Sequence, residues 1–223
     1  MNWLRLYITV EGQAEKAFAD QALTPHFANF NIEVRPRVVL TNRKLGKRGG
    51  ILDFAKIQGD LNRLMAQDKH PEARFTTMID FYALPSGFPG WAEARQRTNP
   101  VERVAALERA LHAEFGDARF YPYIQLHEFE ALLYCDLGEL QRRLSNSEDG
   151  IASLQQEVGH LQPEEINERA DKAPSKRIIR HLPVYESSKV RVGAPAAAAI
   201  GLPVLRAKCP HFAQWISRLE QLV

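Results

Sequence analysis

Hydrophobic and polar positions divide the N-terminal two thirds of the chain into alternating strand and helix patterns. Apolar residues at positions 4, 6, 8 and 10 would lie on one face of a strand, with Trp3 and Tyr7 on the other, which is typical of a strand buried on both faces of a sheet. Further strand patterns cover residues 32–40, 74–79 and 120–126. Helical patterns follow the strands at residues 13–29, 51–67, 99–115 and 128–144. This order predicts an α/β fold with a mostly parallel four-stranded sheet flanked by helices.

Local signals refine several boundaries. Pro36 lies inside the second strand pattern and indicates an edge or bulged position, because proline cannot donate to a sheet ladder. Asn99 followed by Pro100 is a typical helix start, and Gly116 is the matching stop. Residues 41–50 form a basic, glycine-containing loop.

From residue 145 the pattern changes to short helices and proline-rich loops, closed by a helix over residues 212–222. The sequence contains no internal repeat and no clear linker. We therefore expect one domain, with an α/β core over residues 1–144 and a C-terminal extension over residues 145–223 packed on that core.

Composition is typical of a soluble globular protein, with 45% hydrophobic and 25% charged residues. No apolar run approaches the roughly 20 residues that a membrane span needs, and no signal peptide is evident. Cys135 and Cys209 are too few for a disulfide framework, and Cys135 falls in an apolar pattern expected in the core. These features predict a cytoplasmic protein without a membrane partner.

The net charge of +2 conceals two basic blocks, one over residues 35–48 and one over residues 172–191. Such segregation favours a local anionic partner, with solvated loops as the alternative. The first block contains Arg35, Arg37, Arg43, Lys44, Lys47 and Arg48, and the second contains Lys172, Lys176, Arg177, Arg180, Lys189 and Arg191.

Acidic residues follow the ends of the predicted strands. Glu11 ends the first strand and Asp80 the third, so a parallel sheet brings both to one edge. Glu15 lies one helical turn after Glu11, and a cluster of His127, Glu128 and Glu130 follows the fourth strand. Carboxylates converging in this way suit Mg²⁺ or Mn²⁺. The alternatives are that the first acids favour a helix N-terminus, that Asp80 caps a turn, and that His127 bonds to backbone.

Two short motifs resemble a known superfamily. Val10-Glu11-Gly12-Gln13-Ala14-Glu15 is similar to the Val-Glu-Gly-x-Thr-Glu motif of TOPRIM-like domains, and Asp80-Phe81-Tyr82 takes the place of their Asp-x-Asp. The whole chain more closely resembles a bacterial domain-of-unknown-function family of the TOPRIM-like group, distantly similar to the TOPRIM domains of OLD-family nucleases. The stretches that carry this likeness are residues 78–85, 124–133, 173–178 and 206–212.

The resemblance implies a Mg²⁺- or Mn²⁺-dependent nuclease or nicking subunit acting on nucleic acid, with DNA favoured over RNA. Glu11 and Asp80 would be catalytic and would bind the metal, with Glu15 as a second-metal ligand. Tyr82 replaces the second Asp of the motif and Ala14 its hydroxyl residue, so His127, Glu128 and Glu130 are the candidates for the missing ligand. The cations implied for the phosphate backbone are Arg43, Lys44, Lys47, Arg48, Lys176, Arg177 and Lys189.

The resemblance also implies partners, because members of the family often accompany ABC- or AAA-type ATPases in phage-defence gene clusters. A homodimer is compatible with this role. The alternative interpretation is a non-catalytic module that binds a partner ATPase or nucleic acid, which Tyr82 favours. A third, a hydrolase or transferase of small phosphorylated substrates, is opposed by the lack of a phosphate-cradling glycine motif between strand and helix.

Overall fold

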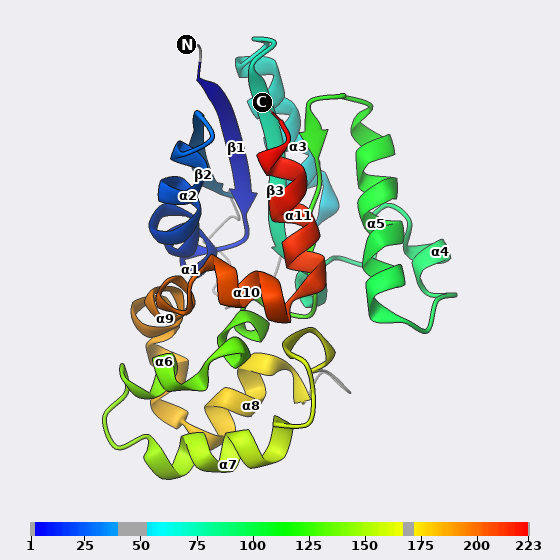
Figure 1. Cartoon of the computed structure of the whole chain (residues 1–223). Coiled ribbons are helices and arrows are strands. Elements are labelled where there is room, and N and C mark those ends of the chain that lie inside the picture. Colours follow the sequence, from blue (N-terminus) through cyan, green and yellow to red (C-terminus); the bar gives the residue numbers. More distant parts are fainter. Residues whose placement is uncertain (1–2, 40–52, 167–171, 223) are drawn as a thin grey trace. The chain divides into compact units, whose positions relative to one another are not determined.

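The computed structural model describes residues 3–39, 53–166 and 172–222 of the 223-residue chain (Figure 1). The chain divides into two compact units, which we call unit 1, ending at Leu126, and unit 2, His127–Leu222. The basic loop expected at residues 41–50 lies outside the described residues. The expected organisation as one domain, with a core to residue 144, stays a prediction.

Unit 1 is built on a parallel sheet with the strand order β2-β1-β3-β4, and β5 pairs with β3 beyond β4. Helices lie in the connections from β1 to β2, from β2 to β3 and from β3 to β4, as parallel pairing requires. This confirms the predicted α/β class with its mostly parallel sheet. The described strands are β1 Leu4–Val10, β2 Ile32–Val38, β3 Ala73–Asp80, β4 Phe120–Tyr121 and β5 Ile124–Gln125.

β1 occupies the centre of the sheet, with β2 and β3 paired to its two edges. Tyr7 is aligned with Arg35 on one side and Phe75 on the other. Pro36 lies in β2, which is the outermost strand on one side of the sheet, so the edge position predicted from this proline is confirmed.

The single strand predicted over residues 120–126 is wrong in detail, because the structure has two short strands, β4 and β5, separated at Pro122. Threonine side chains of β3 bridge the interruption. The Thr77 hydroxyl donates to the carbonyl oxygen of Tyr123 at 2.8 Å and accepts from its backbone N–H at 3.0 Å. Thr76 donates to the carbonyl of Tyr121.

The helices of unit 1 follow the predicted pattern. The helix expected over residues 13–29 is a continuous helical segment with one π-helical turn, η1. Asn99 caps α5 by accepting from the N–H groups of Val101 and Glu102, and Gly116 ends it with φ +59°. The described elements are α1 Gln13–Phe18, η1 Ala19–Leu23, α2 Thr24–Ala28, α3 Phe54–Gln67, η3 Phe81–Ala83, α4 Trp91–Ala94 and α5 Pro100–Phe115.

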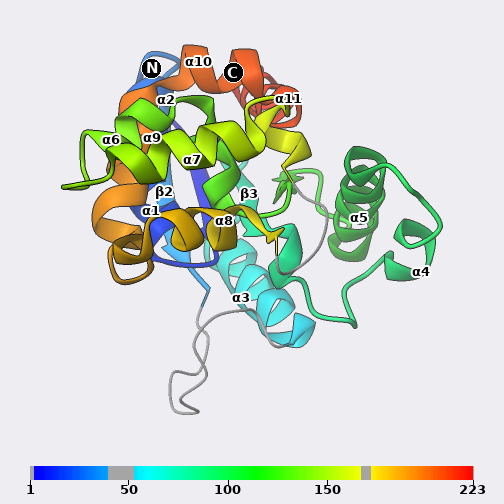
Figure 2. The ribbon, with the colours of Figure 1, turned by 90° about the horizontal axis from the view of Figure 1, so that it is seen from below.

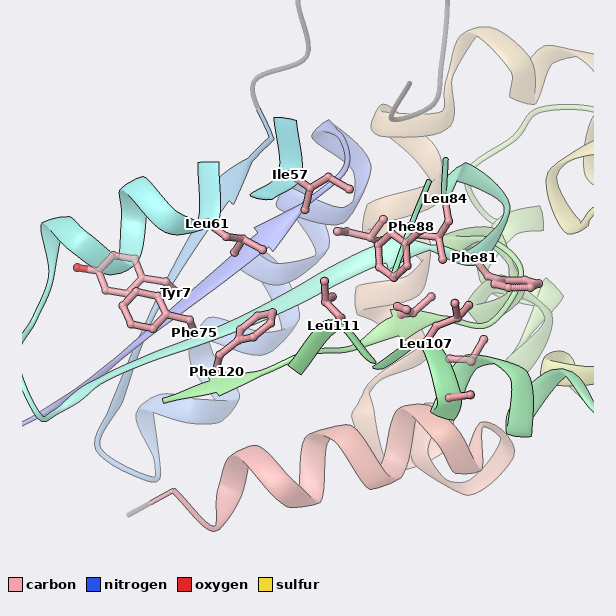
Figure 3. Packing of buried hydrophobic residues seen from close by; sticks show 14 of the residues in the cluster. Tyr7, Ile57, Leu61, Phe75, Phe81, Leu84, Phe88, Leu107, Leu111 and Phe120 are labelled. Atoms are coloured by element: carbon pink, nitrogen blue, oxygen red, sulfur yellow. The ribbon is translucent and has the colours of Figure 1, made fainter. Parts of the chain in front are cut away.

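A hydrophobic cluster of unit 1 packs on one face of the sheet (Figure 3). Tyr7 and Phe75 stack with their ring centroids 5.3 Å apart, and Phe120 continues the row on β4. Side chains of α3 and α5, among them Leu61 and Leu107, complete the cluster. The helical segment α1–η1–α2 contacts β1 and β2.

Unit 2 consists of helices and helical turns (Figure 2). The single helix predicted over residues 128–144 is wrong, because the segment is a 3₁₀ turn followed by a short α-helix. Asp136 separates them, and its carboxylate accepts from the N–H of Gly138 at 2.9 Å to cap the second helix. The elements are η4 Phe129–Cys135, α6 Leu137–Gln141, α7 Glu148–Val158, η5 Pro163–Glu165, α8 Pro174–His181, η7 Pro183–Ser187, η8 Lys189–Gly193, α9 Ala194–Ile200, α10 Leu202–Lys208 and α11 Pro210–Glu220.

No single helix among the described residues is long and apolar enough to cross a membrane. Lys189–Ile200 and Leu202–Lys208 meet the length and composition criteria only as a pair, and they bend by 85° at their junction.

The bridge made by Thr77 predicts a stability effect. Replacing Thr77 by Val keeps the shape of the side chain but leaves the N–H and carbonyl of Tyr123 without this partner. We expect the free energy of unfolding, measured by urea denaturation, to fall by about 1–3 kcal/mol.

Thr9→Val is the matched control. Thr9 is also buried in the sheet, and its hydroxyl has no hydrogen bond within the part of the chain that the structure describes. The control should change stability by no more than about 0.5 kcal/mol. Equal effects of the two substitutions would contradict the bridging role of Thr77.

Candidate functional site

Glu11 and Asp80 lie at the same edge of the sheet. Val10, the last residue of β1, is aligned with Met78 of β3, so the chain reaches Glu11 just beyond β1 and Asp80 at the end of β3. Both residues are half-buried, and one carboxylate oxygen of Glu11 is buried. The parallel pairing of neighbouring strands thus brings together two acids that are distant in sequence.

Glu15 is part of the turn that follows Glu11. Its Oε2 accepts a hydrogen bond from the backbone N–H of Gly12 at 2.9 Å, and the side chain is buried. A Cβ on Gly12 would lie 3.1 Å from that oxygen, so glycine permits the close approach. The carboxylate therefore stabilises the start of α1, which is the alternative that the sequence left open for this acid.

Tyr82 takes the place of the second Asp of the Asp-x-Asp motif, and its ring belongs to a cluster of aromatic side chains. Its ring lies 5.9 Å from that of Phe81, and Phe81 lies 5.7 Å from Trp91. Tyr82 is packed against the hydrophobic cluster of unit 1. The side chain at this position contributes to hydrophobic packing, whereas the Asp of the motif contributes a carboxylate.

The predicted cluster of His127, Glu128 and Glu130 belongs to unit 2, where each side chain bonds to a different segment. The His127 ring is fully buried, and its Nε2 lies 2.9 Å from the carbonyl oxygen of Glu164. Burial lowers the pKa of His127 and so favours the neutral ring. Its backbone has φ +63°, an uncommon conformation for a residue with a side chain.

The two acids of this cluster are held apart. Glu128 accepts from the N–H of Ser175 at 2.8 Å, at the start of α8. Glu130 is buried and forms an ion pair with Lys189 at 2.8 Å. Burial raises the pKa of Glu130, which the Lys189 ammonium opposes. These contacts give both acids structural roles within unit 2.

A metal site of three or more protein ligands is not formed by the His, Cys, Asp and Glu side chains of the described residues. Of the proposed set, Glu11, Glu15 and Asp80 belong to unit 1, and His127, Glu128 and Glu130 belong to unit 2. Mg²⁺, however, is commonly held by one or two carboxylates together with waters and substrate phosphates. Glu11 and Asp80 provide that kind of donor pair at the sheet edge.

The predicted phosphate-binding cations fall into three groups. Arg43, Lys44, Lys47 and Arg48 lie outside the described residues. Lys176 is exposed on α8, as the prediction requires. Lys189 forms an ion pair with Glu130, so the Glu130 carboxylate competes with any phosphate for the Lys189 ammonium.

Arg177 is at odds with the predicted phosphate contact, because its side chain is only 4% exposed. Its Nε donates to the carbonyl of Lys172 at 2.9 Å, and its guanidinium forms an ion pair with Glu157 of the neighbouring helix α7. The two helices lie side by side (Figure 2). The basic run of residues 176–181 therefore mixes exposed cations with a buried structural one.

Gln125 is a polar residue at the sheet edge that sequence reasoning missed. It is aligned with Asp80 across the β3–β5 pair and is fully buried. The Tyr123 hydroxyl donates to its Oε1 at 2.8 Å. The only sequence signal was a single amide between Ile124 and Leu126, within an otherwise apolar strand.

Comparison with known proteins identifies the family. A model described as a domain of unknown function, DUF4276, matches residues 10–220. The chain belongs to the DUF4276 family. Among solved structures, it is similar to the C-terminal region of the Burkholderia pseudomallei OLD protein, with 16% sequence identity and a TM-score of 0.44. The likeness covers 98% of this chain and 99% of that one. No curated protein matches the chain.

In this DUF4276 chain, Glu157 of α7 contacts three basic side chains of α8. It pairs with Arg177, with Arg180 at 3.3 Å and with His181 at 2.7 Å. Burial raises the pKa of Glu157, but His181 and the two arginines outweigh this and hold the pKa below its ordinary value of 4.5. Glu157 is therefore ionised near neutral pH.

Removing this charge tests whether Arg177 is structural. Glu157→Gln leaves a buried guanidinium without its ion pair, and we expect the free energy of unfolding at pH 7 to fall by about 2–3 kcal/mol. A carboxylate with a depressed folded-state pKa stabilises above its unfolded pKa and loses that effect as pH falls. The difference between wild type and variant should thus shrink below about pH 4.5, measured by urea denaturation across pH.

Glu148→Gln is the control, because Glu148 is exposed on the same helix. It should change stability by about 0.5 kcal/mol or less at every pH. A variant at Glu157 that matched this control would show that Arg177 does not need its ion pair.

Proposed function

We propose that this DUF4276 chain is a TOPRIM-like, Mg²⁺- or Mn²⁺-dependent nuclease or nicking subunit that hydrolyses phosphodiester bonds in DNA in preference to RNA. The observation that supports this is the parallel pairing of β1 and β3, which puts Glu11 and Asp80 at one sheet edge. In open α/β sheets, binding sites form outside the carboxyl ends of the strands.

The two carboxylates have roles suited to this chemistry. Neighbouring carboxylates repel one another unless a cation or a proton lies between them, so a pair at one edge favours a divalent ion. Asp80 would act as a metal ligand, and Glu11 as a ligand or as the group that takes a proton from the attacking water. A bound Mg²⁺ stabilises the charge that develops on the phosphate and helps to activate water.

Nucleic acid would be held by exposed cations, of which Lys176 on α8 is the described example. Contacts between lysine or arginine and phosphates release counterions, so binding should weaken as the salt concentration rises. We further propose that an ABC- or AAA-type ATPase of a phage-defence system delivers the nucleic acid, as the family resemblance implies.

Isosteric substitutions at the sheet edge test this proposal. Glu11→Gln and Asp80→Asn keep the size of the side chains but remove the charges that hold a cation and transfer a proton. We expect the rate of plasmid nicking with Mn²⁺ or Mg²⁺ to fall by about 100-fold or more in each variant. Nicked and linear products would be measured on agarose gels, with circular dichroism to verify folding.

Glu102→Gln is the matched control, because Glu102 is an exposed acid on α5 of the same unit. It should nick at the wild-type rate. If both edge variants nick at the wild-type rate, Glu11 and Asp80 have no part in the mechanism, and the proposed nuclease function is contradicted.

A non-catalytic module is the second candidate, and Tyr82 supports it. Its ring packs with Phe81 at the position where the motif has a ligand, and the edge therefore offers fewer acids than an intact motif. This candidate predicts no heat on titrating Mn²⁺ into the protein, together with a stable complex with the ATPase on size-exclusion chromatography. If the protein binds Mn²⁺ at Glu11 and Asp80 but does not nick DNA, the sheet edge binds a metal without catalysing hydrolysis.

A further inference from the structure

Two cysteine thiols lie in contact inside unit 2. Cys135 and Cys209 are 74 positions apart in sequence, yet their Sγ atoms are 3.4 Å apart. Their exposed fractions are 2% and 0%. Cys135 ends η4, and Cys209 lies at the junction of α10 and α11. Nothing in the sequence pattern predicted that these residues would meet.

Hydrogen bonds to the backbone of both cysteines hold them in place. The N–H of Cys209 donates to the carbonyl of Leu205 at 2.8 Å, and its own carbonyl accepts from the N–H of Ala213 at 2.9 Å. Cys209 is therefore fixed by the end of α10 and the start of α11. On the other side, the Lys208 ammonium donates to the carbonyl of Cys135 at 2.7 Å. The contact between the sulfurs thus belongs to regular structure rather than to a loop.

We propose that Cys135 and Cys209 form a modification site at which a peroxide joins the two thiols in an intramolecular disulfide. A disulfide bond is about 2.05 Å long, so the sulfurs must approach by roughly 1.4 Å, which small side-chain rotations can supply. A metal centre is the other use of paired thiols. In the described parts of the chain, however, no third His, Cys, Asp or Glu completes such a group.

The reaction balances with one hydrogen peroxide molecule for each pair of thiols. The sulfur of one cysteine attacks a peroxide oxygen, the O–O bond breaks, and a sulfenic acid and water form, the thiol proton leaving with the water. The sulfur of the other cysteine then attacks the sulfenic sulfur, the S–O bond breaks, and a second water leaves with the proton of that thiol. Two thiols lose two electrons, and the peroxide is reduced to two waters.

The disulfide would join η4 to the α10–α11 junction and close a long loop of the chain. Closing such a loop restricts the unfolded chain and so stabilises the folded unit. In a reducing compartment a disulfide of this kind is usually transient and responds to oxidants. The site involves neither Glu11 nor Asp80, so its test is independent of the nuclease proposal.

The experiment treats the reduced, natively folded full chain with excess hydrogen peroxide and follows free thiols and mass. We expect both thiols to be lost together, the monomer mass to fall by two hydrogens, and a cross-linked peptide containing both cysteines to appear in non-reducing digests. The thermal midpoint should rise by about 5–10 °C and return after dithiothreitol.

Cys135→Ala and Cys209→Ala each leave one thiol and serve as controls. Peroxide should produce neither the cross-linked peptide nor the rise in thermal midpoint in these variants. The proposal is overturned if the native wild-type chain keeps both thiols, if it accumulates sulfinic acids without a cross-link, or if its cross-links join separate chains. These readouts use the wild-type protein, so they decide the question even where a variant folds poorly.

Discussion

The parallel hydrogen bonding of β1 on both of its edges is the constraint on which unit 1 depends. β2 pairs with one edge of β1 and β3 with the other, and nearly all side chains of β1 are buried. The connections from β1 to β2 and from β2 to β3 return over the sheet and contain helices. Parallel pairing also makes all carboxyl ends meet at one edge. The position of Glu11 and Asp80 is therefore a consequence of strand order and direction, before any side-chain contact is considered.

Unit 2 has a comparable centre in residues 127–135, a buried segment whose polar groups bond outward to other segments. His127 reaches Glu164, whose carboxylate accepts from two N–H groups at the start of α11. Glu128 and Tyr134 form hydrogen bonds with the start of α8, and Glu130 forms an ion pair with η8. The carbonyl of Cys135 accepts a hydrogen bond from α10.

Buried ionised groups are tolerated only when they are paired or hydrogen-bonded, and this requirement explains why the segment is so thoroughly connected. The same requirement separates structural from functional acids. Glu128 and Glu130 are polar residues within an apolar sequence, which is also what a metal-binding cluster looks like in sequence. Only the position of Ser175 and Lys189 in space shows that each carboxylate stabilises a neighbouring helical element.

The features that could be predicted are those determined by residues close together in sequence. The apolar repeat of residues 4–10 and the start and stop signals at Asn99 and Gly116 each act through local backbone geometry. The division of the fourth strand has a local signal in Pro122, which cannot donate to a sheet ladder, but the bridge across it could not be predicted, because Thr77 comes from another strand. The burial of Arg177 likewise depends on a distant partner, Glu157.

The candidate site shows the same limit and suggests where to look for chemistry. The order of strands was sufficient to bring Glu11 and Asp80 to one edge, but the structural role of Glu15 depends on its hydrogen bond with the N–H of Gly12, where a Cβ would lie 3.1 Å from the carboxylate oxygen. Glu15 is an acid that caps a helix and so stabilises the fold, whereas Glu11 and Asp80 follow the carboxyl ends of strands, where open α/β sheets form their binding sites. This difference, rather than the number of acids in a segment, makes the sheet edge the better candidate for the metal.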